Sequence, residues 1–303
     1  MSGSFSDAGE HVMQQLLTAP GVRGLDVALG GVRGTLAVSD RYRTVTGANG
    51  QGGDLGHHAS PDLLVRHTVN YLLASDVAAS VNGDGPLLDV GSGVGVFSTW
   101  LARRLERTLH VADHDPAVLR LTQRAFPNVT VHSDLDFAPS AAVVTAMEVI
   151  EHVPYRDQPR FVSDLMSHVE PGGVLICSTP DERRYLGGWS GYEPHIGTLD
   201  FNGLETLLRN VTNLPVQVWR ISGPGFTLGP LQRIGEPLAN RLWALAQRHA
   251  PQWTSQLAGR VGGRRRMQSN SFEPAPADNA FSVTTNPDGL GTGLLAAVFR
   301  PTT

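Results

Sequence analysis

The chain has 303 residues, of which 41% are hydrophobic, so it can bury a sizeable core, and we expect one main domain with additions. Its formal net charge of −4 gives no general attraction to nucleic acid or to a membrane surface. The chain has no lysine and one cysteine, Cys177, which excludes Schiff-base and P-loop lysine chemistry, an internal disulfide and a multi-cysteine metal site. Without a long apolar span or a basic and apolar leader, the sequence favours a cytoplasmic protein.

Residues 1–59 are weakly patterned, and we interpret them as an N-terminal cover segment. Ser60-Pro61-Asp62 predicts a helix start, because serine caps helices and proline is tolerated in the first turn. The remaining elements are predicted from hydrophobic spacing. We expect helices at 63–74, 97–105, 117–125, 160–168 and 201–209. We expect a first strand that begins at 87. Further strands are expected at 109–112, 129–131, 142–146, 174–178, 216–221 and 294–300, with a turn at 171–173.

Alternation of strands and helices is typical of an α/β fold with a parallel sheet and helices on both faces, here with seven strands. Residues 224–289 interrupt this pattern, with helical spacing in the first half and a polar, glycine- and proline-rich second half. We interpret them as a helical insertion before the last strand that forms a lid, or a substrate or partner surface, through which the chain could form homo-oligomers. The core is then expected at 60–223, and the last core strand at 290–303.

A glycine-rich turn follows the first predicted strand, in the run Asp89-Val90-Gly91-Ser92-Gly93-Val94-Gly95. Glycines at such a turn let backbone N–H groups approach a cofactor closely. Asp113 follows the second strand and can accept hydrogen bonds from both hydroxyls of a ribose, and Asp134 follows the third and can accept from an adenine amino group. Each acid taken alone could equally be a helix cap or a solvated loop residue.

The D-x-G-x-G-x-G spacing resembles motif one of the class I S-adenosylmethionine-dependent methyltransferases, and the resemblance covers residues 60–222 and the final strand. It implies a Rossmann-like sheet and S-adenosylmethionine as cofactor. In that family the glycine turn wraps the methionine portion of the cofactor, the second acid holds the ribose and the third region flanks the adenine. The implied cofactor-binding residues are Asp89, Gly91, Ser92, Gly93, Gly95, Asp113, His114, Ser133, Asp134, Ala146 and Met147. The chain departs from many relatives at the start of the fourth strand, where Ala141 and Ala142 replace an acid.

An E-x-x-E-H block follows the fourth strand. Glu148, Glu151 and His152 have the i, i+3, i+4 spacing that shares one face of a helical turn, and they suit Mg²⁺, Mn²⁺ or Zn²⁺. The block resembles that of the ubiquinone-biosynthesis O-methyltransferases and of the small-RNA 3′-end 2′-O-methyltransferases, which implies a divalent cation, with Mg²⁺ favoured. In both groups a histidine lies between the fifth strand and the next helix, and His195 matches it as a further ligand. The alternative is a metal-free strand end whose histidine packs against the sheet or contacts the substrate.

Together these patterns predict an O-methyltransferase that acts on a small molecule, such as a metal-chelated catechol or a sugar diol of a natural product. We expect His152 and Glu148 to be catalytic, with His58 from the Gly56-His57-His58 cluster as a further base, unless those histidines are simply exposed. One rival is terminal 2′-O-methylation of RNA, against which the net charge and the lack of interleaved basic and aromatic residues argue. Another is a non-catalytic methyltransferase-like subunit that binds partners through 224–289.

Overall fold

The computed structural model describes residues 70–222 except Leu72, Val94 and Leu186, residues 282–302, and a few separate positions between 234 and 249. The predictions for 1–59, for the helix start at Ser60, for His57 and His58 and for most of 224–289 lie outside these residues. In the described part of the chain, no helix is both long and apolar enough to cross a lipid bilayer.

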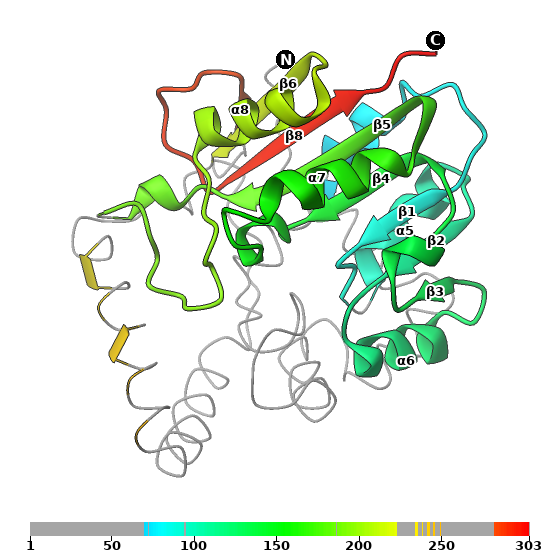
Figure 1. Ribbon diagram of the computed structural model, residues 1–303, viewed down its shortest axis with the longest axis horizontal. Coiled ribbons are helices and arrows are strands. Elements are labelled where there is room, and N and C mark those ends of the chain that lie inside the picture. Colours follow the sequence, from blue (N-terminus) through cyan, green and yellow to red (C-terminus); the bar gives the residue numbers. More distant parts are fainter. Residues whose placement is uncertain are drawn as a thin grey trace.

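One eight-stranded sheet organises the described residues, in the order β3-β2-β1-β4-β5-β8-β6-β7 (Figure 1). The strands are β1 (Leu87–Val90), β2 (Leu109–Ala112), β3 (Thr130–His132), β4 (Ala141–Met147), β5 (Val169–Pro180), β6 (Val216–Ser222), β7 (Ser282–Thr284) and β8 (Gly293–Phe299). The first five run parallel, whereas β8 lies antiparallel to both β5 and β6, and β7 is antiparallel to β6. The carboxyl ends of β1 to β5 therefore meet at one edge of the sheet.

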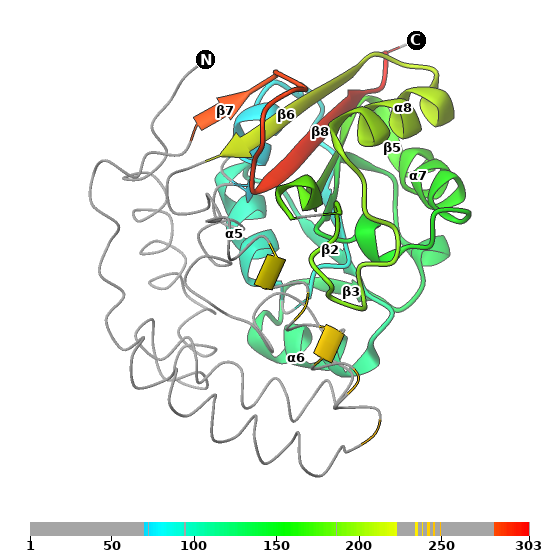
Figure 2. The ribbon, with the colours of Figure 1, turned by 90° about the vertical axis from the view of Figure 1, so that its left-hand side faces the viewer.

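Helices cover both faces of the sheet (Figure 2). Helix α5 (Val96–Arg104), α6 (Pro116–Ala125) and the helical residues 73–78 lie on one face, and α7 (Gln158–Ser167) and α8 (Phe201–Thr212) lie on the other. Among the described residues, three short 3-10 helices occupy connections, namely η2 (Leu135–Phe137), η3 (Ile150–His152) and η4 (Glu182–Arg184). Helix α8 shows why these segments are helical: Asp200 caps it, and its buried residues Phe201, Leu204 and Leu208 recur on one face.

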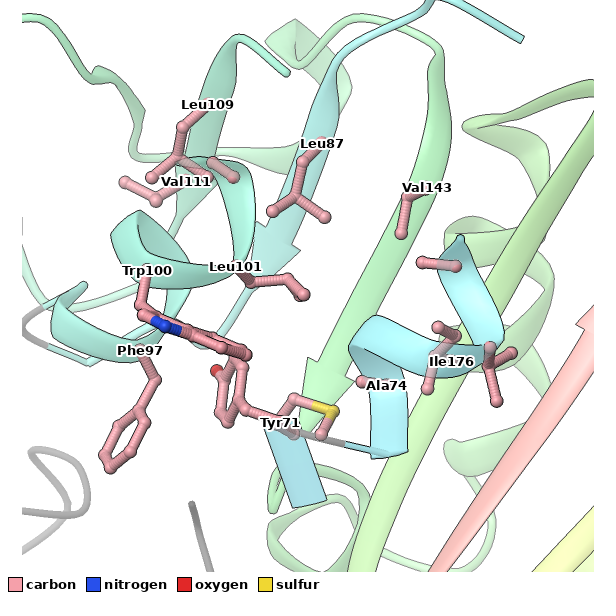
Figure 3. Close-up of a cluster of buried hydrophobic side chains, with 14 of the residues drawn as sticks. Tyr71, Ala74, Leu87, Phe97, Trp100, Leu101, Leu109, Val111, Val143 and Ile176 are labelled. Atoms are coloured by element: carbon pink, nitrogen blue, oxygen red, sulfur yellow. The ribbon is translucent and has the colours of Figure 1, made fainter. Parts of the chain in front are cut away.

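Two apolar layers, one on each face of the sheet, form the core. Leu87 of β1 packs with Trp100 and Leu101 of α5 in the first layer (Figure 3), whereas its neighbour Leu88 belongs to the second layer with α7 and α8. This alternation follows from the two-residue period of a strand. Cys177 is buried in β5, and burial raises the pKa of its thiol to about 12, so it has the structural role that its apolar surroundings predict.

The α/β class and the helix-covered parallel sheet are confirmed, but two details of the prediction are wrong. The sheet has eight strands rather than seven, because β7 adds to its edge from within the segment assigned to the insertion. Strand β5 also runs through the predicted turn at 171–173. Gly172, with φ of 79°, makes a local irregularity there while its N–H donates to the Arg300 carbonyl at 3.0 Å, so the strand continues past the irregularity.

Two histidines form a pair on β2 and β3, with Nδ1 of His110 at 3.0 Å from Nε2 of His132 and His168 beside them. Burial lowers the pKa of both His110 and His132 from the ordinary 6.5, and the partner imidazole adds to this for His110. Because the pKa of these histidines is lower in the folded state, they take up protons at a higher pH in the unfolded chain as the pH falls. The pair therefore contributes stability above pH 6.5 that is lost as the pH falls below it. We expect the urea midpoint to fall less between about pH 7.5 and about pH 5.5 in His132→Gln than in wild type.

Candidate active site

Polar and glycine residues follow the carboxyl ends of the parallel strands. Gly91 comes after β1, Asp113 after β2, Ser133 after β3, Glu148 after β4 and Asp181 after β5. Ligands of open α/β sheets bind at this edge, and four of these five residues, all but Asp181, belong to the predicted site.

The glycine turn depends on backbone conformations that only glycine adopts readily. Gly91, Gly93 and Gly95 have φ values of 72°, 54° and 72°. A Cβ atom on Gly91 would lie 2.5 Å from a methyl carbon of Val149, so a side chain there would also displace the segment after β4. Gly95 is the N-cap of α5. The turn therefore leads directly from β1 into a helix N-terminus, and three of its residues have no Cβ atom.

Asp89, two residues before Gly91, is buried beneath the turn. Its carboxylate accepts hydrogen bonds from the Tyr71 hydroxyl at 3.1 Å, the Thr145 hydroxyl at 2.6 Å and the Ser98 hydroxyl. These three donors come from the helical segment at 70–78, from β4 and from α5. The described contacts of Asp89 thus tie the elements around the turn together, and its predicted contact with a cofactor would be additional to them.

Asp113 lies beside the turn at the end of β2, with 9% of its side chain exposed. Its carboxylate accepts hydrogen bonds from the backbone N–H of Asp115 at 2.9 Å and from that of Gly93. Burial raises the pKa of the Asp113 carboxyl, although these hydrogen bonds and nearby His114 oppose the rise. The exposed His114 ring has its Nδ1 atom 3.4 Å from Asp113 Oδ1.

The remaining predicted cofactor residues differ in exposure. Ser133 and Asp134 are exposed, and Asp134 accepts a hydrogen bond from the Asp136 N–H at 3.1 Å as the cap of η2. Ala146 and Met147 are buried at the end of β4, in opposite core layers. Ser92 is buried within the turn.

Glu148 leaves β4 in the left-handed region, with φ of 58°. Its Oε1 atom accepts from the Asn70 side-chain amide at 3.1 Å and from the Ser178 hydroxyl at 3.2 Å, and its N–H donates to the Ser178 carbonyl at 3.0 Å. The predicted continuous helical turn from Glu148 to His152 is wrong, because helical geometry begins only at Ile150. Glu148 therefore does not share a helix face with Glu151.

Three of the four predicted metal ligands do come together. One potential ligand atom from each of Glu151, His152 and His195 lies within 4.8 Å of the other two. Glu151 is buried, and its Oε2 atom accepts from the Thr179 hydroxyl at 3.1 Å. The rings of His152 and His195 meet edge to face, with centroids 5.1 Å apart.

The Nδ1 atom of each histidine is held by a protein acceptor. His152 Nδ1 lies 3.0 Å from the Pro194 carbonyl oxygen, and His195 Nδ1 lies 2.7 Å from Glu182 Oε1. Although His152 is exposed as a residue, desolvation of its ring and then the nearby His195 lower its pKa, which favours the neutral form. A carbonyl oxygen only accepts, so His152 carries its proton on Nδ1 and a lone pair on Nε2.

Gln158 joins the two segments that carry the cluster. Its buried side-chain amide donates to the carbonyl oxygens of Ile150 at 3.0 Å and Gly197 at 2.6 Å. A Cβ atom on Gly197 would lie 2.0 Å from the Val153 carbonyl oxygen, so only glycine permits this approach. Sequence reasoning missed Gln158, Glu182 and Thr179, because their partners lie far along the chain and no local motif marks them.

Comparisons with known proteins show what the chain is similar to. A model of the methyltransferase domain family matches residues 62–216, just over half of the chain. Over 100 residues the chain is 38% identical to a ubiquinone biosynthesis O-methyltransferase of Paramagnetospirillum magneticum, a match that covers 31% of this chain and 39% of that protein. Over 107 residues it is 32% identical to a probable S-adenosylmethionine-dependent methyltransferase of Mycolicibacterium smegmatis, covering 34% and 40%. The chain thus spans about two fifths of the length of these curated relatives.

Among solved structures, one similar to this chain is phosphoethanolamine N-methyltransferase 2 of Haemonchus contortus in complex with S-adenosylmethionine. The similarity has a TM-score of 0.47 and 16% sequence identity, and it covers 91% of this chain and 60% of that one.

Proposed function

The chain belongs to the methyltransferase domain family, the class I enzymes that use S-adenosylmethionine, and from this premise we propose that it methylates an oxygen atom of a small molecule. The observation that supports the proposal best is the cluster of Glu151, His152 and His195 at the same sheet edge as the glycine turn and Asp113. The O-methyltransferase among its relatives supports the choice of oxygen as acceptor.

The residues at the turn fit the methyl donor. When bound, S-adenosylmethionine supplies an electrophilic methyl group on a sulfonium sulfur. The turn formed by Gly91, Gly93 and Gly95 would lie against its methionine portion, and the Asp113 carboxylate would accept hydrogen bonds from its ribose hydroxyls. Asp89 would keep the turn in place from beneath.

We expect Asp113→Ala to weaken S-adenosylmethionine binding by about 1.5–3 kcal/mol, the contribution of hydrogen bonds to a charged group. The raised pKa of Asp113 adds a signature in pH. Since the carboxylate is the accepting form, affinity should begin to fall, as the pH is lowered, at a higher pH than for an ordinary aspartate. Calorimetry at several pH values on wild type, Asp113→Ala and Asp113→Asn measures the affinity for S-adenosylmethionine. Wild-type affinity in both variants would show that Asp113 does not hold the ribose.

The cluster beside the donor site fits a divalent cation. Glu151 would offer a carboxylate oxygen, and His152 and His195 would offer Nε2 atoms, since their Nδ1 atoms are engaged. One carboxylate and two imidazoles suit Mn²⁺ or Zn²⁺ better than Mg²⁺, which prefers oxygen ligands. When bound, such a cation would lower the pKa of an acceptor hydroxyl and hold its oxygen in place. Vicinal oxygens chelate best, so a catechol or a sugar diol is the favoured acceptor class.

The chain's own residues would complete the acceptor site. The lone pair on His152 Nε2 could take a proton from an acceptor hydroxyl in a metal-free reaction, and the lowered pKa of the ring keeps that lone pair available near neutral pH. Tyr192 packs edge-on against His195, with ring centroids 4.9 Å apart, and supplies an apolar wall beside the cluster. Glu148, held by Asn70 and Ser178, lies on the β4 side of the cluster.

Methyl transfer from labelled S-adenosylmethionine to matched acceptor panels would test the proposal. The panels should contain catechols, sugar diols, their singly hydroxylated counterparts, amines, and RNA with a free 3′ terminus. We expect turnover on vicinal diols and much less on the monohydroxy counterparts. Transfer to RNA alone would favour the terminal 2′-O-methyltransferase, and transfer to amines alone would contradict oxygen as acceptor. Donor binding without transfer to any panel would favour a partner-binding subunit.

A further inference from the structure

We propose that Glu182 is a positioning residue, which holds His195 in the single tautomer and ring orientation that directs its Nε2 lone pair into the cluster with Glu151 and His152. The proposal rests on the cation-assisted function described above, and it adds a residue that belongs to none of the motifs of the sequence.

The contact between Glu182 and His195 is short and protected from water. Glu182 Oε1 lies 2.7 Å from His195 Nδ1, and the two side chains are 4% and 13% exposed. Glu182 lies in η4, directly after β5, while His195 lies thirteen residues later in the connection to α8. The hydrogen bond therefore anchors the middle of an irregular connection to a short helix next to the sheet.

The second oxygen of Glu182 is also used. Its Oε2 atom accepts from the backbone N–H of Ser190, so both carboxylate oxygens act as acceptors within the same connection. An ionised carboxylate only accepts, so its partner at His195 must be an Nδ1–H donor. In its neutral form, His195 then has its proton on Nδ1 and its lone pair on Nε2. Free imidazole samples both tautomers, and Glu182 would remove that choice.

The arrangement parallels that of His152, where the Pro194 carbonyl fixes the neighbouring ring in the same tautomer. Glu151 is likewise oriented by the Thr179 hydroxyl. A described partner thus orients each of the three side chains. Partners of this kind affect metal affinity by about 10–100-fold when they are removed. Glu182 differs from the other two partners in carrying a charge, which would add to the attraction for a cation.

Calorimetric titration of Mn²⁺ and of Zn²⁺, each alone, into the full chain tests the proposal. Glu182→Gln removes the charge and one of the two acceptors, and we expect cation affinity to fall by about 10–100-fold. S-adenosylmethionine affinity should stay at the wild-type value, which shows that the variant is folded and that only the cation site has changed. The matched control is Asp164→Asn, which removes one exposed carboxylate charge from α7 and should bind both cations like wild type.

A second experiment determines the tautomer of His195 in the wild-type protein, so it does not depend on whether Glu182→Gln folds. Long-range proton–nitrogen correlation spectra of the metal-free wild type report which ring nitrogen carries the proton, and the spectrum of His195→Gln assigns the signal. A proton on Nδ1 of His195 supports the proposal, whereas a proton on Nε2 alone overturns it. Either result stands even if Glu182→Gln fails to fold.

Different results would refute the role of Glu182 and the cation-assisted function on which it rests. If wild type binds a cation and Glu182→Gln binds it equally well, the role of Glu182 is refuted while the proposed function stands. If wild type binds neither cation but methylates diols in the presence of a chelator, the cation is refuted, and the positioning role of Glu182 toward it fails as well.

Discussion

Replacing Arg220 by methionine is expected to lower the free energy of unfolding by about 3–5 kcal/mol, because it removes the fully buried partner of the Asp181 carboxylate and leaves only the more distant, partly exposed Arg183 beside it. Arg220 and Asp181 are both fully buried, and Nε of the arginine donates to Asp181 Oδ2 at 2.9 Å. The guanidinium also donates to the Asn286 carbonyl and lies over the Phe201 ring, 5.1 Å from its centroid. One side chain thus links β6, the end of β5 and the connection into β8.

Two variants separate the charge effect from simple loss of packing. Arg220→Met combined with Asp181→Asn should be more stable than Arg220→Met alone, since no unpaired charge remains buried. Arg209→Met removes an exposed arginine that pairs with Glu205 on α8, and it should cost less than about 1 kcal/mol. Urea unfolding followed by circular dichroism measures all three. A loss for Arg220→Met no larger than that for Arg209→Met would mean that the buried pair contributes nothing.

Removal of the cation site is expected to reduce turnover by about 10²–10³-fold, which corresponds to about 3–4 kcal/mol of transition-state stabilisation. His195→Ala should show this loss in kcat, while its affinity for S-adenosylmethionine stays within about twofold of wild type, since the cation activates the acceptor and not the donor. Exhaustive chelation of wild type should have the same effect, and added Mn²⁺ or Zn²⁺ should reverse it.

The control for this experiment is His168→Asn, a histidine that contacts the Pro139 carbonyl rather than the cluster. It should retain wild-type turnover and the wild-type response to chelation. Full activity after chelation, with no metal detected by elemental analysis, would favour the metal-free reaction in which His152 Nε2 takes the acceptor proton. The argument for diols as acceptors would then lose its basis.

The regular part of the fold follows from local patterns in the sequence. The short run Leu109–Ala112 favours a strand, and the apolar period of α8 predicts a helix. The prediction was wrong where tertiary contacts decide. Strand β7 has three residues and needs β6 as its neighbour, and Gly172 belongs to a continuous strand because Arg300 offers it an acceptor.

The donor side of the site could be predicted from local sequence patterns, whereas the acceptor side could not. Gly91 and Asp113 are marked by their position directly after strands, so the donor side of the site was accessible to sequence reasoning. On the acceptor side, the conformation of Glu148 depends on Ser178 and Asn70, which accompany it only in the folded chain. The roles of Glu182 and Gln158 depend likewise on loop contacts that no periodic pattern encodes.

A ribosome must release residues 293–299 before the sheet can close, because β8 lies between β5 and β6. Until then both strands present an unpaired edge, and β6 has no neighbour that connects it to the parallel half of the sheet. Such edges are templates for wrong pairing with other chains, so the nascent protein is most exposed to aggregation until β8 has joined β5 to β6. For the same reason, a stop codon just before Gly293 would divide the sheet in two rather than shorten it.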